Sequence, residues 1–210
     1  MARETGRRKP LNENAIAVIG EGITEQYYLQ SIKQLTNFQI TPKLPKHSAG
    51  DDFVEVEIKK CIADGYSIIY CLIDMDNKKS GVEKAKYQKL KSKYHNKVIR
   101  NIGVGSESQV KFFENERCLE IWFLFYYKYT TAEFSTQNDL LKELNKLCRY
   151  EKTEKFFLST RGLHQYFINK GGSFDLAKRN AVSSIKRIAE HGTDYTYSEM
   201  KEFFDLIQKK

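Results

Sequence analysis

The 210-residue sequence lacks the motifs of several common enzyme and membrane-protein classes. No apolar run approaches the ~20 residues that a membrane-spanning helix needs, so the sequence predicts no membrane span. Its four cysteines form no CxxC pair and it contains no HExxH sequence, which argues against a zinc site. It also has no GxxxxGK[ST] phosphate loop, so we expect any associated ATPase to be a separate chain.

The cysteines and the first residues favour a cytoplasmic protein. The cysteines lie far apart, which predicts buried thiols in a reducing compartment rather than disulfides. Residues 1–12 are basic, but no apolar segment follows them, so we do not expect a secretory signal. We interpret these residues as a flexible basic arm.

Positive charge is concentrated in one short segment. The net charge is +8, and residues 77–100 contain nine basic side chains and the single acid Glu83, which also gives +8. Lysines on the helix expected at about residues 82–94 fall on one stripe. They form either a solvated outer face or a surface that binds nucleic-acid phosphates. The second interpretation predicts nucleic-acid binding by Lys78, Lys86, Lys89, Lys93, Lys97 and Lys111.

The first half of the chain alternates between strand and helix patterns. This order predicts an α/β fold with a mostly parallel sheet flanked by helices. Short runs rich in β-branched residues predict strands at Ala15–Ile19, Phe38–Leu44, Ser67–Ile73 and Lys97–Val104.

The second half shows helical patterns only. The apolar segment Cys118–Tyr127 fits either a buried strand or a buried helix, and we favour the helix. We expect later helices to be capped by Asn138, Ser173 and Thr196. The sequence therefore predicts a catalytic domain at residues 13–128 and a helical C-terminal extension, residues 129–210, packed on it.

Acidic side chains follow two of the predicted strands. Glu21 and Glu25 come after the first strand, and Asp74 and Asp76 after the third. Parallel strands end at the same edge of a sheet, where such folds bind their ligands. Asp74 and Asp76 project to the same side of an extended chain, and their charges repel unless a cation lies between them. Carboxylate oxygens favour Mg²⁺ or Mn²⁺ over zinc.

Two other acidic motifs do not fit Asp74-Met-Asp76. An EF-hand loop needs an oxygen ligand and then glycine where Lys78 and Lys79 stand. A haloacid-dehalogenase phosphatase needs Thr or Val at the position of Lys78. An ordinary acidic loop remains the alternative to a metal site.

Together these motifs resemble those of known families. Glu21-Gly-Ile-Thr-Glu25 and Asp74-Met-Asp76, each after a strand, resemble the Toprim catalytic domain of topoisomerases, primases and OLD-type nucleases. The segment Asn115–Phe125 is similar to the Asn-Pro-Cys-Phe-Glu-x-Trp-Leu-Leu-Leu signature of the RloB-like family, associated with bacterial abortive infection and restriction loci. It departs from this signature at Glu116–Arg117, where Asn-Pro is expected.

The resemblance implies a role for each carboxylate. Asp74 and Asp76 would hold Mg²⁺ or Mn²⁺, and Glu21 would complete the metal shell or act as a general base on water. Glu25, one helical turn after Glu21, would bind a second metal.

Glu120 would be the fourth catalytic residue, because the family signature has a glutamate at this point. It lies in an apolar run, where an unpaired carboxylate is costly. The alternative is a structural ion pair with Arg117 or Lys128. Trp122, the single tryptophan, is assigned to core packing.

The function implied is a metal-dependent nuclease that hydrolyses phosphodiester bonds in DNA or RNA, tRNA included, in bacterial anti-phage defence. A separately encoded ATPase is an expected partner, and the chain is a candidate homo-oligomer. The alternative is a catalytically silent nucleic-acid-binding or sensor subunit that acts with such a partner. His47 is a further candidate for acid chemistry, and Arg161 for contact with the phosphate.

Overall fold

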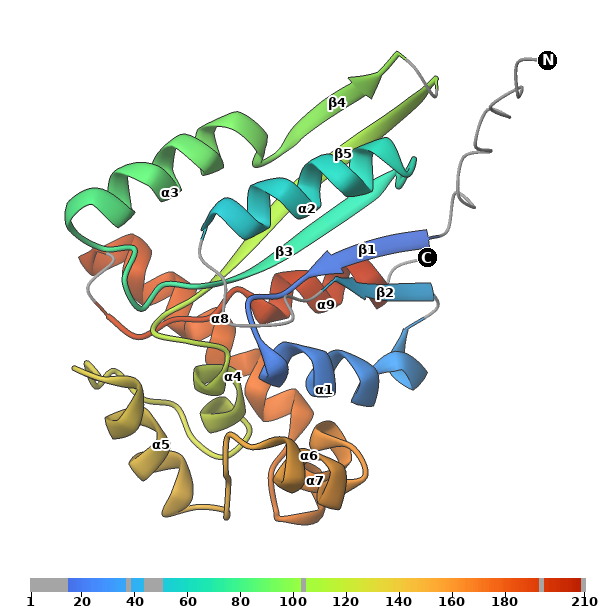
Figure 1. Cartoon of the computed structure of the whole chain (residues 1–210). Coiled ribbons are helices and arrows are strands. Elements are labelled where there is room, and N and C mark those ends of the chain that lie inside the picture. The colour runs from blue at the N-terminus through green and yellow to red at the C-terminus, as the bar shows by residue number, and fades with distance from the viewer. Residues whose placement is uncertain (1–14, 37–38, 44–50, 103–104, 193–194, 209–210) are drawn as a thin grey trace.

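A five-stranded sheet forms the centre of the computed structural model, which describes residues 15–36, 39–43, 51–102, 105–192 and 195–208 (Figure 1). The strand order is β2-β1-β3-β5-β4. Four strands are parallel, and the edge strand β4 runs antiparallel to β5. The α/β fold with a mostly parallel sheet is therefore confirmed. The strands are β1 (Ala15–Ile19), β2 (Gln39–Lys43), β3 (Ile68–Asp74), β4 (Lys97–Asn101) and β5 (Ser106–Asn115).

Strand β5 is the strand that the sequence patterns did not predict, and the short helices at Glu154–Thr160 and Leu163–Asn169 were not predicted either. Only its second half is continuously buried, and charged residues such as Glu107, Lys111 and Glu114 interrupt its apolar pattern. It pairs with β3 along its length, so that Asp74 lies opposite Asn115. Because β4 and β5 form an antiparallel pair, the end of β4 lies away from the edge where β1 and β3 end.

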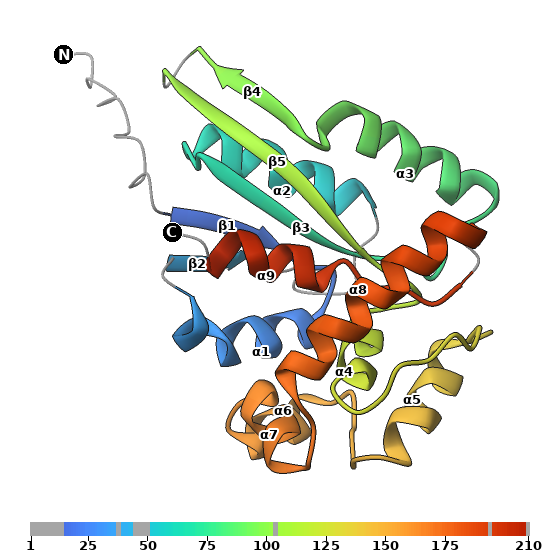
Figure 2. The same cartoon turned by 180° about the vertical axis from the view of Figure 1, so that it is seen from behind.

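Helices cover both faces of the sheet. The helices α2 (Asp51–Ala63) and α3 (Gly81–Tyr94) cover one face, whereas α1 (Ile23–Ser31), α8 (Phe174–His191) and α9 (Met200–Gln208) lie on the other (Figures 1 and 2). Side chains alternate between the two faces along each strand. The strands are therefore apolar on both faces, which is why their sequences are continuous apolar runs.

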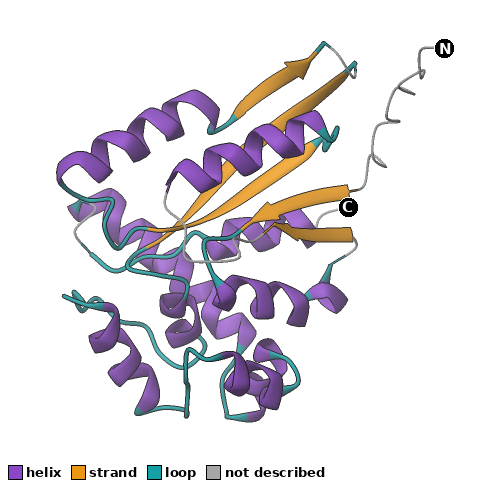
Figure 3. Cartoon of the chain, viewed as in Figure 1, coloured by secondary structure: helices purple, strands orange, loops and turns teal. Residues whose placement is uncertain are grey.

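The remaining helices extend the core beyond the sheet (Figure 3). The helix α4 (Glu120–Phe125) is completely buried and packs against α5 and α8, which confirms the buried helix expected at Cys118–Tyr127. Side chains of α4 to α9 share one core with β1 and β3. The division at residue 128 stays a prediction. The short helices are α5 (Gln137–Asn145), α6 (Glu154–Thr160), α7 (Leu163–Asn169) and a 3-10 turn at Lys33–Leu35.

Only one of the three expected caps is in place. Ser173 accepts a hydrogen bond from the backbone N–H of Leu176 and caps α8, as predicted. The prediction that Asn138 caps α5 was wrong, because the hydroxyl of Thr136 caps this helix. Thr196 was also wrong: its hydroxyl donates to the carbonyl of Ala132 instead of capping α9. Several side chains with an oxygen atom lie near the start of each of these helices, so the local sequence does not specify which of them caps the helix.

All four cysteines are buried and none forms a disulfide, as expected. Trp122 is also buried: it stacks on Phe204 with 5.6 Å between ring centroids and donates from Nε1 to the hydroxyl of Tyr28. Among the described residues, no helix is long and apolar enough to span a membrane.

A second acidic cluster lies where β5 meets the start of α9. Glu114 accepts hydrogen bonds from Tyr87 at 2.5 Å and Tyr197 at 2.9 Å, and pairs with Lys91. Although burial opposes it, hydrogen bonding to Lys91 and Tyr87 lowers the pKa of Glu114. Glu199 accepts from the backbone N–H of Glu114, and burial raises the pKa of Glu199 to about 7, with a further contribution from the charge of Glu114.

We expect Glu199 to make the protein less stable as the pH rises from about 4.5 to about 7.5. The folded chain holds this proton up to a pKa of about 7, whereas an unfolded glutamate loses it near its ordinary value. The free energy of unfolding should fall by up to about 3 kcal/mol across this range, and Glu199→Gln should reduce the fall. Urea unfolding at several pH values measures both. Glu133→Gln, which removes an exposed carboxylate elsewhere, is the control, and an unchanged pH profile in Glu199→Gln would refute the assignment.

Candidate functional site

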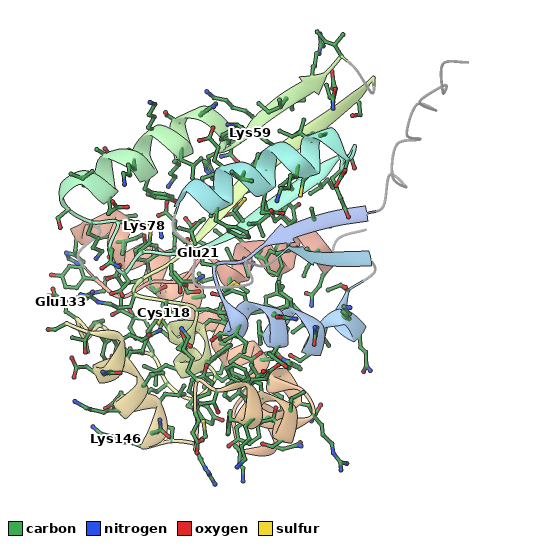
Figure 4. All side chains as sticks on the ribbon, viewed as in Figure 1. Glu21, Lys59, Lys78, Cys118, Glu133 and Lys146 are labelled. Carbon is green, nitrogen blue, oxygen red and sulfur yellow. The ribbon has the colours of Figure 1, made fainter. Side chains whose placement is uncertain are left out.

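The carboxylates predicted from the sequence gather where β1 and β3 end. β3 ends at Asp74, and the turn after β1 carries Glu21 into α1. Figure 4 shows Glu21, Lys78 and Cys118 in the same part of the molecule, at this edge of the sheet. The position agrees with the ligand-binding edge of other open parallel sheets.

Lys78 lies between the two strand ends. Its ammonium donates to both carboxylate oxygens of Glu21, each at 3.0 Å, and to the backbone carbonyl of Asp74 at 2.8 Å. The side chains of Lys78 and Glu21 are only 9% and 12% exposed. Lys78 therefore belongs to this site, as the predicted phosphate contact, but here it is paired with a carboxylate.

Glu25 has a structural role at the start of α1. Its side chain is almost fully buried and bonds back to the backbone N–H of Gly22, the N-cap residue. A Cβ at Gly22 would lie 3.3 Å from Oε2 of Glu25, so glycine leaves room for this contact. The arrangement is half of a capping box, in which the third helical residue satisfies the cap.

Glu120 is fully buried at the start of α4 and faces the same group. Its Oε1 accepts hydrogen bonds from Thr24 at 3.0 Å and Tyr150 at 2.9 Å, and lies 3.3 Å from the ammonium of Lys152. Its Oε2 has no hydrogen-bond partner among the described residues. The two alternatives considered for Glu120 do not occur, because Arg117 pairs with Asp76 and Lys128 with Glu143.

The carboxylates act strongly on one another. Burial, together with the charges of Glu25, Glu21 and Glu120, raises the pKa of Asp74 well above its usual range. Burial and the charge of Glu120 raise the pKa of Glu25. Although burial opposes it, the charge of Lys152 lowers the pKa of Glu120. The charges of Glu21, Glu25 and Glu120 therefore all act on Asp74, as expected for carboxylates that share one site.

Asp76 does not join this group. Its carboxylate is 42% exposed and accepts a hydrogen bond from Arg117 at 2.8 Å. Arg117 has a left-handed backbone, with φ of 63°, and also donates to the carbonyl of Phe134, so it ties the loop after β5 to Asp76. The predicted convergence of Glu21, Asp74 and Asp76 within metal-binding distance therefore does not include Asp76, and for Glu21 and Asp74 it stays a prediction. Extended spacing placed Asp76 beside Asp74, but the chain leaves β3 at Asp74.

Sequence reasoning missed the residues that Glu120 contacts. Thr24 comes from α1, whereas Tyr150 and Lys152 come from the loop between α5 and α6. Although burial opposes it, the charge of Glu120, followed by those of Asp74 and Glu25, raises the pKa of Lys152. No local pattern marks a lysine in a polar loop as a site residue, so nothing in the sequence would have identified it.

The lysines predicted to bind nucleic acid are spread over three places. Lys86, Lys89, Lys93 and Lys97 are exposed along α3 and at the start of β4. Glu83 and Glu55 lie 2.8 Å and 2.7 Å from Lys86 and Lys93. Lys111 is mostly buried and pairs with Glu202 on α9, which makes it a poor phosphate contact.

Two further candidates were His47 and Arg161. His47 lies outside the described residues. Arg161 ends α6, and a Cβ on the following Gly162 would lie 3.5 Å from the Cβ of Ser31 at the end of α1. Because Glu25 is at the start of that helix, Arg161 is at the other end of α1 from the carboxylates.

Lys152→Met should lower the free energy of unfolding by about 1–3 kcal/mol. It leaves Glu120 buried without its counter-charge, and the 31% exposure of the Lys152 side chain moderates the loss. Chemical denaturation with a chelator present measures the change. Lys146→Met removes an exposed lysine on α5 and should cost under about 0.5 kcal/mol. In the double variant Lys152→Met/Glu120→Gln, the second substitution should recover part of the lost stability. If the two changes in unfolding free energy simply add, Lys152 and Glu120 do not interact.

The charge of this group fits a divalent cation. Four carboxylates, Glu21, Glu25, Asp74 and Glu120, face two ammonium groups, Lys78 and Lys152, and one buried oxygen of Glu120 has no partner. All the donors are hard oxygens, which suit Mg²⁺ or Mn²⁺. As the side chains stand, no three His, Cys, Asp or Glu residues in the described part of the chain are arranged to hold a metal ion. Binding therefore requires side chains to move, Lys78 first among them.

Comparison with known proteins identifies the family. No curated protein and no solved structure matches the chain. A family model described as "RloB-like protein" matches residues 16–208. This range contains β1 to α9, including all four carboxylates, and the chain therefore belongs to the RloB-like family.

Proposed function

We propose that the chain is a Toprim-type, metal-dependent nuclease that hydrolyses phosphodiester bonds in nucleic acid. The observation that carries this proposal is the buried group formed by Glu21, Glu25, Asp74 and Glu120 at the carboxyl edge of a parallel sheet. Burial of so much like charge is costly for stability alone, and such clusters are typical of functional sites. Membership of the RloB-like family is consistent with it.

The residues fall into separate roles in this proposal. Asp74 and Glu21 would hold a Mg²⁺ or Mn²⁺ ion, which supplies an activated water and neutralises charge on the phosphate. Glu120, fixed through Oε1, keeps Oε2 available to orient or deprotonate a water. Glu25 keeps α1 capped beside them and contributes negative charge. The exposed lysines of α3 would hold the nucleic-acid backbone.

A catalytically silent nucleic-acid-binding subunit is the second candidate. The observation that favours it is the pairing of Lys78 with Glu21 and of Arg117 with Asp76, which neutralises two of the predicted metal ligands. In this case the carboxylates would be a structural remnant, and the basic helix α3 would carry the function.

Incubation of the purified chain with nucleic acids separates the two candidates. Plasmid DNA, single-stranded DNA and total tRNA are each incubated with Mg²⁺, Mn²⁺ or a chelator. Cleavage of any one of them in metal but not in chelator supports the nuclease. Binding without cleavage in every condition, by a chain whose fold is verified, supports the silent subunit unless a partner restores cleavage.

Cellular context belongs to the same proposal. A cytoplasmic role in anti-phage defence, beside a separately encoded ATPase, follows from the family resemblance of the motifs and not from any contact in the structure. A homo-oligomer of the chain belongs to the proposal as well, because it would present two such sites to one nucleic acid.

A further inference from the structure

Lys78 occupies the space between the two best candidate metal ligands. Its ammonium reaches both oxygens of Glu21 and the backbone carbonyl of Asp74, within 3.0 Å in each case. The contacts are almost completely buried, with 9% of the Lys78 side chain exposed. This ammonium therefore neutralises one negative charge at the ends of β1 and β3, and it holds both carboxylate oxygens of Glu21 that a divalent ion would need.

We propose that Lys78 is a tethered cation that competes with the divalent metal for Glu21. Without metal, its ammonium stabilises the buried carboxylates; when a metal binds, Lys78 must leave Glu21. The inference rests on the proposed function, since it assumes a metal at this site, and adds to it a residue that sets the metal affinity.

The surroundings give the displaced ammonium somewhere to go. Lys78 also lines a pocket of about 280 Å³ beside α3, together with Lys79, Lys84, Lys91 and Glu114. After leaving Glu21, the ammonium of Lys78 can therefore be hydrated in this pocket, next to the site. In that position it adds a positive charge to a lysine-rich wall that lies beside the path proposed for nucleic acid.

The chain offers a matched control in the neighbouring residue. Lys79 lines the same pocket and has an acidic partner of its own, Glu116, at 2.9 Å. Lys79→Met and Lys78→Met therefore remove the same charge from nearly the same place, but Lys78→Met removes the hydrogen bonds to both oxygens of Glu21.

The test is the metal affinity of the intact chain without nucleic acid. Mn²⁺ and Mg²⁺ binding is measured by titration calorimetry and by the shift of the thermal midpoint for wild type, Lys78→Met, Lys78→Gln and Lys79→Met. We expect Lys78→Met to bind metal at least about tenfold more tightly than wild type, because a close buried charge pair no longer has to be broken. Lys79→Met should stay within about threefold of wild type, since its acidic partner Glu116 is not a proposed metal ligand.

Each outcome decides the matter. Equal or weaker binding by Lys78→Met than by wild type overturns the competition while leaving the metal site itself in place. Equal gains in Lys78→Met and Lys79→Met also overturn it, because general charge would then explain both. If Lys78→Met is unfolded, Lys78→Gln, which keeps a donor for Glu21, decides by the same criterion. If no variant binds metal, the proposed metal-dependent function fails with it.

Discussion

Asp74→Asn is expected to lower the rate of nucleic-acid cleavage about a thousandfold or more. Loss of a ligand carboxylate removes transition-state charge stabilisation of several kcal/mol, and each 1.36 kcal/mol changes the rate tenfold. The fold should persist, because the amide oxygen can still accept the 3.0 Å hydrogen bond from the backbone N–H of Leu119. Removal of one charge also relieves repulsion from Glu21, Glu25 and Glu120.

Three measurements check this expectation. A cleavage assay at saturating substrate gives the rate, a gel shift gives nucleic-acid binding, and thermal unfolding in chelator gives stability. Binding should persist and the thermal midpoint should be equal to or above that of wild type. Asp175→Asn, an exposed carboxylate in the first turn of α8, is the matched control and should behave as wild type.

The comparison with Asp76→Asn separates two forms of the site. Because Asp76 is partly exposed and paired with Arg117, its substitution should affect cleavage much less than that of Asp74. An equally large loss would mean that Asp76 leaves Arg117 to join the metal. Normal cleavage by Asp74→Asn would instead end the assignment of the catalytic centre to this edge.

Replacing Lys86, Lys89, Lys93 and Lys97 together by Gln is expected to weaken nucleic-acid binding at least about tenfold at low salt. The slope of log affinity against log salt should become shallower by about 2–4 units, because each phosphate contact on duplex contributes about 0.9. Lys86 and Lys93 already pair with Glu83 and Glu55, so the smaller value applies if those pairs persist in the complex. Stability should change little, since the four side chains are exposed.

A second set of four lysines provides the control for total charge. Lys142, Lys146, Lys155 and Lys186 are exposed on the helices that follow α4, and their replacement by Gln removes the same charge. Gel shifts at two salt concentrations compare both variants with wild type. If the two variants lose binding equally, overall charge and not α3 attracts the nucleic acid; if the α3 variant binds as wild type does, α3 is only a solvated face.

The sequence by itself determined the sheet architecture and the edge at which the carboxylates gather. The short apolar runs at Ile16–Ile19 and Ile69–Ile73 are buried on both faces, and a parallel sheet between helix layers buries them in this way. Glu21 and Asp74 follow those strands directly, so their positions were fixed by chain connectivity. Strand β5 escaped prediction because its apolar positions are interrupted by charges that other elements neutralise, such as Glu114 with Lys91.

Only the tertiary structure decided which groups share the site. Asp76 is two residues from Asp74 in the sequence but pairs with Arg117 away from the other carboxylates. Lys152 is 78 residues from Asp74 in the sequence but joins the site by pairing with Glu120. The reason is physical: a strand pattern specifies the direction of a side chain only while the strand continues, and a buried charge takes whichever opposite charge the packing brings near. Local sequence therefore gives the place of this site, and long-range packing gives its composition.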